Sequence, residues 1–329
     1  MVIPTLAADV RLLECLESLK RQTQRDFEVI VVDNSGAGRA RRANQDPRIR
    51  IVENARNQGF GAAVNQGFQA SHTPYLAVLN DDALAHAEWL ATMLAAMESR
   101  PDVGMCASQV RLFGEDRLDS AAMLVARDGS SKQRGHGRPP DDFPELEEAL
   151  FPSGSAALYR RAMLDDIGLF DSSFFLYCED TDLGLRARWA GWKCLFVPGA
   201  VVEHHYSYSA GRASALKAYF VERNRLFVVA KNFPGRMLLA APLVSIARYL
   251  WHVWYILQGR GSAARFRAEG NTGLRMIWYI LRAHAAVLGS ASRLWKQRRA
   301  IRAKARITPA VFRALIASHA ISARRVAEL

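Results

Sequence analysis

The sequence predicts an α/β protein, in which a mostly parallel sheet is flanked by helices, followed by a basic helical region at the C-terminal end. Segments with strand and helix patterns alternate from residue 2 to about residue 110, and this alternation is typical of a parallel sheet covered on both faces. Residues 258–329 contain 15 Lys/Arg and 2 Asp/Glu, a net charge of +13 in a chain whose total is +12. A body with almost no net charge therefore precedes a basic region, which suits an anionic partner.

The elements of the alternation follow from their own patterns. Leucines three and four residues apart predict a helix around 12–19, and the β-branched run 27–32 predicts a buried strand that ends at Asp33. The Gly-, Pro- and Ser-rich stretch 128–148 is predicted to be a mobile loop. The remaining expected elements are strands at 48–52, 75–79, 103–110 and 194–197, and helices near 62–68, at 89–99 and through Trp189.

Two acidic clusters carry most of the chemistry that the sequence indicates. The first is Asn80-Asp81-Asp82, at the end of the apolar run 75–79. Adjacent carboxylates repel each other unless a cation lies between them, and carboxylate oxygens suit Mg²⁺ or Mn²⁺, which in turn bind phosphate oxygens. We predict that Asp82 binds a divalent cation on a diphosphate and that Asp81 contacts a ribose or a metal-bound water. The alternative is a loop cap before the helix at 89–99.

The second acidic cluster is Glu179-Asp180-Thr181-Asp182, before the helix that runs through Trp189. The N-terminus of a helix stabilises carboxylates, so capping accounts for one or two of the three acids but not readily for all of them. A carboxylate in this place can act as a general base.

Three further motifs have open interpretations. Asp33 either accepts a hydrogen bond from a nucleotide base or ribose at a strand end, or caps the next helix. The tandem His204-His205 supplies a metal ligand or a phosphate contact, or is structural. The stretch 57–65 resembles a dinucleotide-binding fingerprint of a nicotinamide dehydrogenase, but Val64 replaces its third glycine and five residues separate Gly59 from the strand.

Two apolar segments follow the body. The segment 237–258 is long enough to cross a bilayer, which takes ~20 residues, but Arg248 at its middle costs ~2.5–3.5 kcal/mol on insertion scales. Arg248 shares one helical stripe with Ser245 and His252, and the segment 275–282 has a similar Arg-bearing pattern. We therefore expect both segments to be amphipathic helices that lie in the interface of an anionic membrane. The alternative is that they are core helices.

Taken together and in this order, the motifs resemble the family 2 glycosyltransferases of the rhamnosyltransferase-like bacterial type. The matching pieces are Ile3-Pro4-Thr5, Val32-Asp33-Asn34-Ser35, Asn57-Gln58-Gly59-Phe60-Gly61, Leu79-Asn80-Asp81-Asp82, Ser153-Gly154-Ser155-Ala156, Phe175-Leu176-Tyr177-Cys178-Glu179-Asp180-Thr181-Asp182-Leu183, His204 with Ser209, and Arg223-Asn224.

The resemblance implies a GT-A fold and a role for each matching residue. A nucleotide-sugar donor would be bound by Thr5, Asp33, Asn57, Gly59, Asn65 and Asp81. A divalent Mg or Mn ion would be held by Asp82 and His204, Asp180 would be the general base, and Glu179, Asp182 and Arg223 would lie near the acceptor.

The activity implied is inverting transfer of a sugar, with rhamnose as one candidate, from a nucleotide-diphosphate donor to a hydroxyl of a cell-envelope or lipid-linked glycan. Residues 1–232 are expected to form the GT-A catalytic domain. Residues 233–329 are expected to hold the enzyme on the inner, cytoplasmic face of the membrane, and the four cysteines, which form no CxxC pair, favour that reducing compartment. No nucleic acid partner is expected. A dehydrogenase and a nucleic-acid-binding protein that uses the basic region are the alternatives.

Overall fold

The computed structural model describes residues 1–44, 46–205 and 215–329, and these form two compact units. The first, here called the sheet unit, comprises Met1–Met123, Gln133–Phe175 and the chain from Gly191 through strand β12 (Lys193–His204). The second, the helical unit, comprises Leu124–Lys132, Leu176–Ala190 and the chain from helix α7 (Ala215–Asn232) onward. The expected boundary at residues 232/233 between a catalytic domain and a membrane-binding region stays a prediction, because these two units are defined by their compact structure and not by their function.

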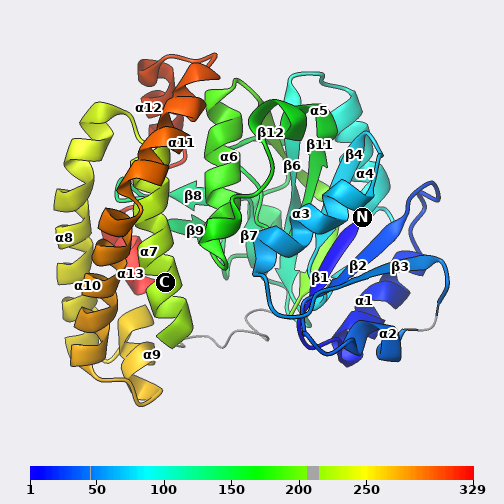
Figure 1. Ribbon diagram of the computed structural model, residues 1–329, viewed down its shortest axis with the longest axis horizontal. Helices are drawn as coiled ribbons and strands as arrows, with labels where there is room; N and C mark the ends of the chain where they lie inside the picture. The colour runs from blue at the N-terminus through cyan, green and yellow to red at the C-terminus, as the bar shows by residue number, and fades with distance from the viewer. Residues whose placement is uncertain (45, 206–214) are drawn as a thin grey trace. The chain divides into compact units, whose positions relative to one another are not determined.

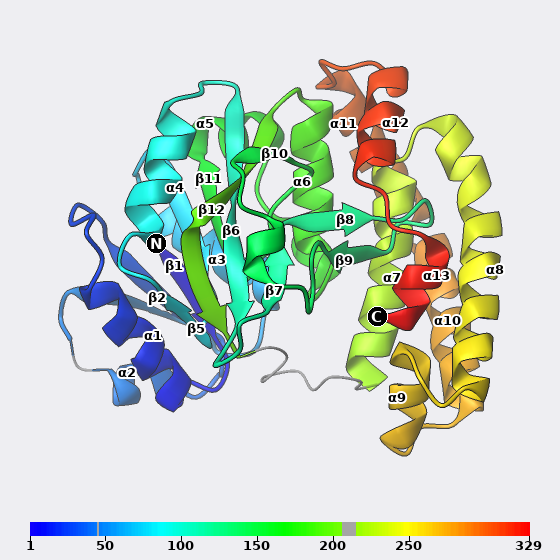
Figure 2. The ribbon, with the colours of Figure 1, turned by 180° about the vertical axis from the view of Figure 1, so that it is seen from behind.

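The sheet unit is built on one mixed sheet (Figures 1 and 2), whose main strand order is β10-β12-β6-β11-β4-β1-β2-β3. Strand β1 pairs in parallel with β2 and β4, β2 with β3, and β6 with β12. Strand β11 lies antiparallel between β4 and β6, so the sheet is not parallel throughout. The bounds are β1 (Val2–Thr5), β2 (Val29–Asp33), β3 (Ile49–Glu53), β4 (Tyr75–Leu79), β5 (Ala83–Ala85), β6 (Val103–Leu112), β7 (Leu118–Ala121), β10 (Glu147–Ala149) and β11 (Ala156–Arg160).

The helices of the sheet unit pack on the sheet through their apolar faces. Helix α3 packs closely on β1, because a Cβ at Gly67 would lie 2.4 Å from the side chain of Val2. Helix α4 packs on β6 and β12 through buried residues such as Trp89 and Met93. The bounds are α1 (Val10–Lys20), α2 (Arg39–Ala43), α3 (Phe60–Ala70), α4 (Trp89–Glu98) and α5 (Arg161–Ile167), with a short 3₁₀ helix η2 (Ser172–Phe174).

The helical unit is organised around α7, which packs against α6, α8, α10 and α11 (Figure 1). A hairpin of β8 (Met123–Val125) and β9 (Ser131–Gln133) precedes it in the chain. Trp189 stacks on Phe312 with ring centroids 4.1 Å apart and donates a 2.9 Å hydrogen bond to the carbonyl of Asn232. The other bounds are α6 (Glu179–Trp189), α8 (Gly235–Leu257), α9 (Ser262–Ala268), α10 (Gly273–Gly289), α11 (Ala291–Ala303), α12 (Pro309–Ser318) and α13 (Ala323–Glu328).

The stretch 128–148, expected to be a mobile loop, contains regular structure instead. It includes β9, the 3₁₀ helix η1 (Pro140–Asp142) and the start of β10. Asp128 is fully buried and pairs with Arg248 of α8 at 2.6 Å. The Gly, Pro and Ser residues of the stretch predict its turns correctly. The order of the stretch depends on Arg248, which lies 120 residues from Asp128 and therefore cannot be inferred from the local sequence.

Candidate active site

The carboxyl ends of the parallel strands bring Thr5 and Asp81 together in the sheet unit. Thr5 ends β1 and Asp81 follows β4, and the Thr5 hydroxyl donates to Oδ2 of Asp81 at 2.6 Å. Burial and the neighbouring charge of Asp82, opposed by the Thr5 hydrogen bond, together raise the pKa of Asp81 to about 6. The predicted donor residues Thr5 and Asp81 thus form one polar pair at the edge where α/β sheets bind ligands.

Asp82 and His204 are the residues of the sheet unit that best fit a divalent cation. Nε2 of His204 lies 3.1 Å from Oδ1 of Asp82, yet this buried oxygen accepts no hydrogen bond. Nδ1 of the same ring lies 2.8 Å from Oδ2 of Asp119, a carboxylate that fixes the orientation of the ring. Mg²⁺ and Mn²⁺ sites commonly use one or two side chains plus substrate phosphates and water, so an oxygen and a nitrogen that face each other are a sufficient protein contribution.

The charges around His204 are consistent with that use. Burial lowers the pKa of His204, but the carboxylates of Asp119 and Asp82 raise it to about 10. Burial raises the pKa of Asp119, and hydrogen bonds to His136 and His204 bring it down to about 2. Without metal, His204 is therefore an imidazolium between two carboxylates, and a cation bound at Asp82 would release the proton from Nε2. Within the described residues no group of three or more His, Cys, Asp or Glu side chains could hold a metal. Ser209 lies outside the described residues.

The other predicted donor residues make hydrogen bonds inside the sheet unit. Both carboxylate oxygens of Asp33 accept backbone N–H groups, from Ser35 at 2.8 Å and Ala40 at 2.7 Å, which is the capping alternative. Asn65 uses both ends of its amide on the backbone of Phe170, at 2.8 and 3.0 Å. These bonds give both residues a structural role, and their donor contacts stay predictions.

Asn57 and Gly59 likewise shape the turn before α3. Oδ1 of Asn57 accepts from the backbone N–H of Gly59 at 2.8 Å and from the side chain of Asn34 at 3.0 Å. The backbone of Phe175 lies against Gly59, and the N–H of Phe60 donates to the Phe175 carbonyl at 2.8 Å. Glycine is required at position 59 for this close approach, whether or not the turn also contacts a nucleotide.

The three acids at the start of α6 have three different environments in the helical unit. Glu179 is buried with an unbonded Oε2, and burial followed by the charge of Asp180 raises its pKa to about 8. Asp182 is 0% exposed and contacts Arg186 at 2.9 Å and Lys231 at 2.8 Å, so it ties α6 to α7. Asp180 is partly exposed, and its Oδ1 accepts the N–H of Thr181 at 2.6 Å. Asp180 is thus the carboxylate of this cluster that is open to solvent.

The turn before Asp180 is held by Asn224 of α7. Tyr177 and Cys178 have positive φ angles of 69° and 65°, which are unfavourable for residues with side chains. The fully buried amide of Asn224 donates to the carbonyls of Leu176 at 2.8 Å and Tyr177 at 2.7 Å. Nε of Arg223 donates to Oδ1 of Asn224 at 2.8 Å, so Arg223 orients the amide, and its predicted acceptor contact stays a prediction.

Two of the residues that shape these places were absent from the sequence-based set of sites. Asp119 lies in the buried strand β7. The signal available in the sequence was an acidic residue among small and apolar neighbours, Leu118, Ser120 and Ala121. Asn224 was visible only as a motif without a role. In both cases the partner is distant in sequence, so only the folded chain shows what the side chain does.

The fold and these side chains define a class of protein, the nucleotide-sugar glycosyltransferases, and comparison with known proteins agrees. The sequence model of the family described as Glycosyl transferase family 2 matches residues 1–168. A relative from Mycobacterium tuberculosis (strains CDC 1551 / Oshkosh and ATCC 25618 / H37Rv), named N-acetylglucosaminyl-diphospho-decaprenol L-rhamnosyltransferase, is 29% identical over 246 residues. The match covers 67% of this chain and 80% of the relative.

Two solved structures share the fold. The mannosyltransferase PcManGT of Pyrobaculum calidifontis, in complex with GDP-Man and Mn²⁺, aligns with a TM-score of 0.50 and 19% identity over 94% of this chain and 86% of that one. GalNAc-T7, solved with UDP, GalNAc and Mn²⁺, aligns with a TM-score of 0.58 and 16% identity over 75% of this chain and 50% of that one. The predicted GT-A-like fold with a C-terminal helical region is therefore confirmed.

The chain belongs to glycosyl transferase family 2. It is a glycosyltransferase that uses a nucleotide-sugar donor, as the ordered motifs predicted. The dehydrogenase interpretation of the stretch 57–65 is not supported.

Proposed function

We propose that this enzyme is a metal-dependent, inverting transferase that moves a hexose, with rhamnose as the first candidate, onto a hydroxyl of a lipid-linked or cell-envelope glycan. The observation that carries the proposal is the match over 80% of the mycobacterial relative, whose name specifies an L-rhamnosyl transfer to a lipid diphosphate sugar. A nucleotide-diphosphate sugar is then the donor, and a lipid-linked sugar the acceptor.

In this proposal Asp180 is the general base. Glu179, with a pKa of about 8, is protonated at neutral pH, and Asp182 is held in buried ion pairs. That leaves Asp180 to accept the proton of the acceptor hydroxyl as its oxygen attacks the anomeric carbon of the donor. Asn224 keeps the preceding turn in place and acts as a positioning residue. One displacement with a base on the acceptor inverts the anomeric configuration.

Asp82 and His204 would hold the divalent cation, and Asp119 would orient His204 from behind. When bound, the cation neutralises the negative charge that develops on the leaving diphosphate. Asp81, fixed by Thr5, would contact the ribose of the donor or water on the cation.

The base is tested by Asp180→Asn, with Asp165→Asn on the exposed surface of α5 as a matched control. Initial rates with a panel of nucleotide-diphosphate sugars should show a turnover lower by about 10²–10⁴-fold for Asp180→Asn and unchanged donor affinity. Retention of more than about a tenth of the activity would argue against this assignment.

The cation is tested by calorimetry of nucleoside diphosphate binding with and without Mn²⁺. Asp82→Asn should remove the part of the affinity that depends on Mn²⁺, because it removes one of the two protein ligands. The same change at exposed Asp116 is the control. Affinity that stays equally dependent on Mn²⁺ in Asp82→Asn means that the cation lies elsewhere.

We also propose that the enzyme works on the anionic, cytoplasmic face of a membrane, with α8 as the contact. Among the described residues, α8 is the helix that is long and apolar enough to cross a bilayer. Only 22% of its most apolar 18-residue stretch is buried, so most of this apolar surface is free to contact lipid. Ser245 and Arg248 face the interior of the helical unit, while the opposite side of α8 is apolar and exposed. Its exposed members are Leu239, Leu243, Ile246, Leu250, Val253, Trp254 and Leu257.

Charge supports a lipid surface over a second copy of the chain. Helices α8, α10 and α11 contain no Asp or Glu, and exposed Arg236 and Arg260 flank the apolar side of α8. Two copies would bring like charges together, whereas anionic lipids attract about 1 kcal/mol per basic residue near the surface. Along α10, Arg275 and Arg282 are exposed beside the exposed apolar residues Ile277 and Trp278.

Flotation with liposomes tests the membrane contact. Wild type should float with vesicles that contain anionic lipid, and Leu250→Glu should float much less, because it places a charge on the apolar side. Val311→Glu, at a similarly exposed apolar residue of α12, is the control. If wild type stays with the soluble fraction in all vesicles, the membrane part of the proposal fails and the glycosyltransferase assignment is untouched.

A further inference from the structure

Lys132, in strand β9, is a partly buried cation without an anionic partner. Within the described residues its ammonium makes no hydrogen bond and no ion pair. Burial, and then the positive charges of Lys217, Arg265 and Arg248, lower its pKa to about 8. A half-buried cation with other cations near it is destabilised unless an anion binds to it. Lys132 therefore indicates a ligand that carries negative charge.

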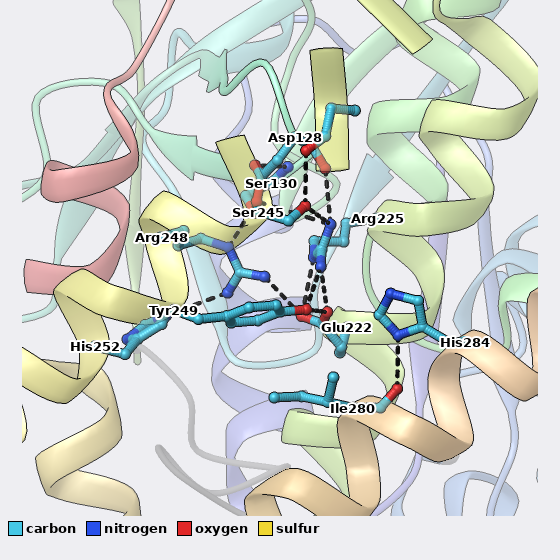
Figure 3. Close-up of polar contacts among 11 residues, drawn as sticks. Asp128, Ser130, Glu222, Arg225, Ser245, Arg248, Tyr249, His252, Ile280 and His284 are labelled. Carbon is cyan, nitrogen blue, oxygen red and sulfur yellow. Dashed lines mark hydrogen bonds and ion pairs between the residues drawn. The ribbon is translucent and has the colours of Figure 1, made fainter. Parts of the chain in front are cut away.

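Two buried carboxylates of the helical unit, Asp128 and Glu222, are already used by arginines (Figure 3). Arg248 contacts Asp128 at 2.6 Å and Glu222 at 2.9 Å, and Arg225 pairs with the same Glu222. Burial raises the pKa values of both carboxyls, and the two guanidinium groups lower them below their usual range. The negative charges of these two carboxylates are thus balanced by the positive charges of the two guanidinium groups, and the charge of Lys132 is not balanced by either carboxylate.

Lys132 and Lys217 come from segments that contact the turn of the proposed base. Ser131, next to Lys132, accepts a hydrogen bond from the hydroxyl of Thr181 at 2.9 Å, and Thr181 follows Asp180. On the other side of the cluster, Nζ of Lys217 lies 5.6 Å from the ring centroid of Tyr177, three residues before Asp180. Strand β9 and helix α7 thus both contact the turn that carries the proposed base.

We propose that Lys132 and Lys217 bind a phosphate group of the acceptor substrate. The inference rests on the proposed lipid-linked acceptor and names the feature by which the enzyme would recognise it. Lysine ammonium groups are common phosphate ligands, and in a sugar linked to a diphosphate the phosphate is within one sugar ring of the reacting hydroxyl. A phospholipid headgroup carries the same chemistry, so the experiments separate the two sources.

The first experiment measures binding of inorganic diphosphate by calorimetry in EDTA, which keeps the cation site at Asp82 from contributing. Lys132→Gln and Lys217→Gln should each weaken binding at least tenfold, whereas Lys296→Gln, the same change on exposed α11, should not. Lys132→Gln should also unfold at the wild-type temperature or above it, because it removes a repelled charge. Equal affinities in wild type and both variants would overturn the inference.

The second experiment compares two acceptors with the same sugar and the same octyl chain, one joined through a diphosphate and one as a plain glycoside. Lys132→Gln should raise the KM for the diphosphate acceptor at least tenfold and leave the KM of the glycoside and of the donor unchanged. An equal loss on both acceptors would show a structural defect and overturn the assignment.

The third experiment separates the sources of phosphate. If Lys132→Gln weakens flotation with phosphatidylglycerol vesicles but leaves the kinetics of the diphosphate acceptor unchanged, the bound group is a lipid headgroup and the acceptor assignment is wrong. If inorganic diphosphate binding depends on Lys132 while wild type ignores every phosphate-linked acceptor, the phosphate site stands and the proposed acceptor class fails.

Discussion

Gly59 offers a sharp test of whether the turn before α3 is structural or binds the nucleotide. Its backbone has φ 88° and ψ 165°, and a Cβ there would lie 2.3 Å from the carbonyl oxygen of Phe175. Gly168 has nearly the same backbone, with φ 82° and ψ 164°, and no atom within 4 Å of its Cβ position. The two glycines differ mainly in the space beside them, so alanine at each separates backbone strain from steric overlap.

We predict that Gly168→Ala lowers the free energy of unfolding by about 1–3 kcal/mol, the cost of a side chain in a backbone region that glycine alone populates readily. Gly59→Ala has the same backbone cost and a further overpacking cost of about 1–3 kcal/mol, because the obstacle is backbone and cannot rotate away. The expected loss of about 2–6 kcal/mol is a large part of the about 5–15 kcal/mol that folded proteins have.

The assay is urea denaturation followed by tryptophan fluorescence. With an m-value of about 2–3 kcal/mol per molar urea, the midpoint for Gly59→Ala should lie about 0.3–1.5 M below that for Gly168→Ala. Equal midpoints would mean that the close approach to Phe175 does not exist in solution. A Gly59→Ala variant that is as stable as wild type but binds nucleoside diphosphate weakly would refute the structural role and make Gly59 a donor contact.

Three other predictions concern the cation site and the buried charges. Asp119→Asn should weaken Mn²⁺ binding by about 10–100-fold in calorimetry, because His204 loses the group that orients it, while Asp116→Asn has no effect. The pKa of His204 is raised from 6.5 to about 10, so its protonated ring stabilises the fold below pH 6.5, and this contribution is lost as the pH rises through about 10. The unfolding temperature in EDTA should fall over that window more in wild type than in His204→Gln. Arg248→Met should cost about 3–5 kcal/mol in urea denaturation because it leaves Asp128 and Glu222 short of a cation, whereas Met at exposed Arg236 should change stability by less than about 0.5 kcal/mol.

The sequence predicted most strands and helices because their patterns are local. The runs at 27–32, 75–79 and 103–110 became β2, β4 and β6, and the leucine spacing became α1. Strand β11 was missed, although it lies at the centre of the sheet between β4 and β6. Its five residues are a strand because two neighbours supply hydrogen bonds on both sides, and such pairing depends on residues far along the chain.

The candidate site divides in the same way. Asp82 and His204 were identified from separate motifs, and the structure places them 3.1 Å apart. Asp182 looked equivalent to Asp180 in the sequence, but Arg186, Lys231 and Asn232 bury it in the contact between α6 and α7. Neighbouring acids on one helix point in different directions, and what each meets is decided by the elements packed around it.

By itself, the sequence determined the family, the alternation of strands and helices, and the carboxylates that follow β4, because ordered motifs and apolar periods are properties of short segments. It also determined that α8 has a polar stripe around Arg248 and an apolar stripe around Leu250. Only the tertiary structure decided which stripe faces inward. Periodicity defines two faces of a helix but not their surroundings, and the carboxylates that draw Arg248 into the interior, Asp128 and Glu222, come from a hairpin and another helix.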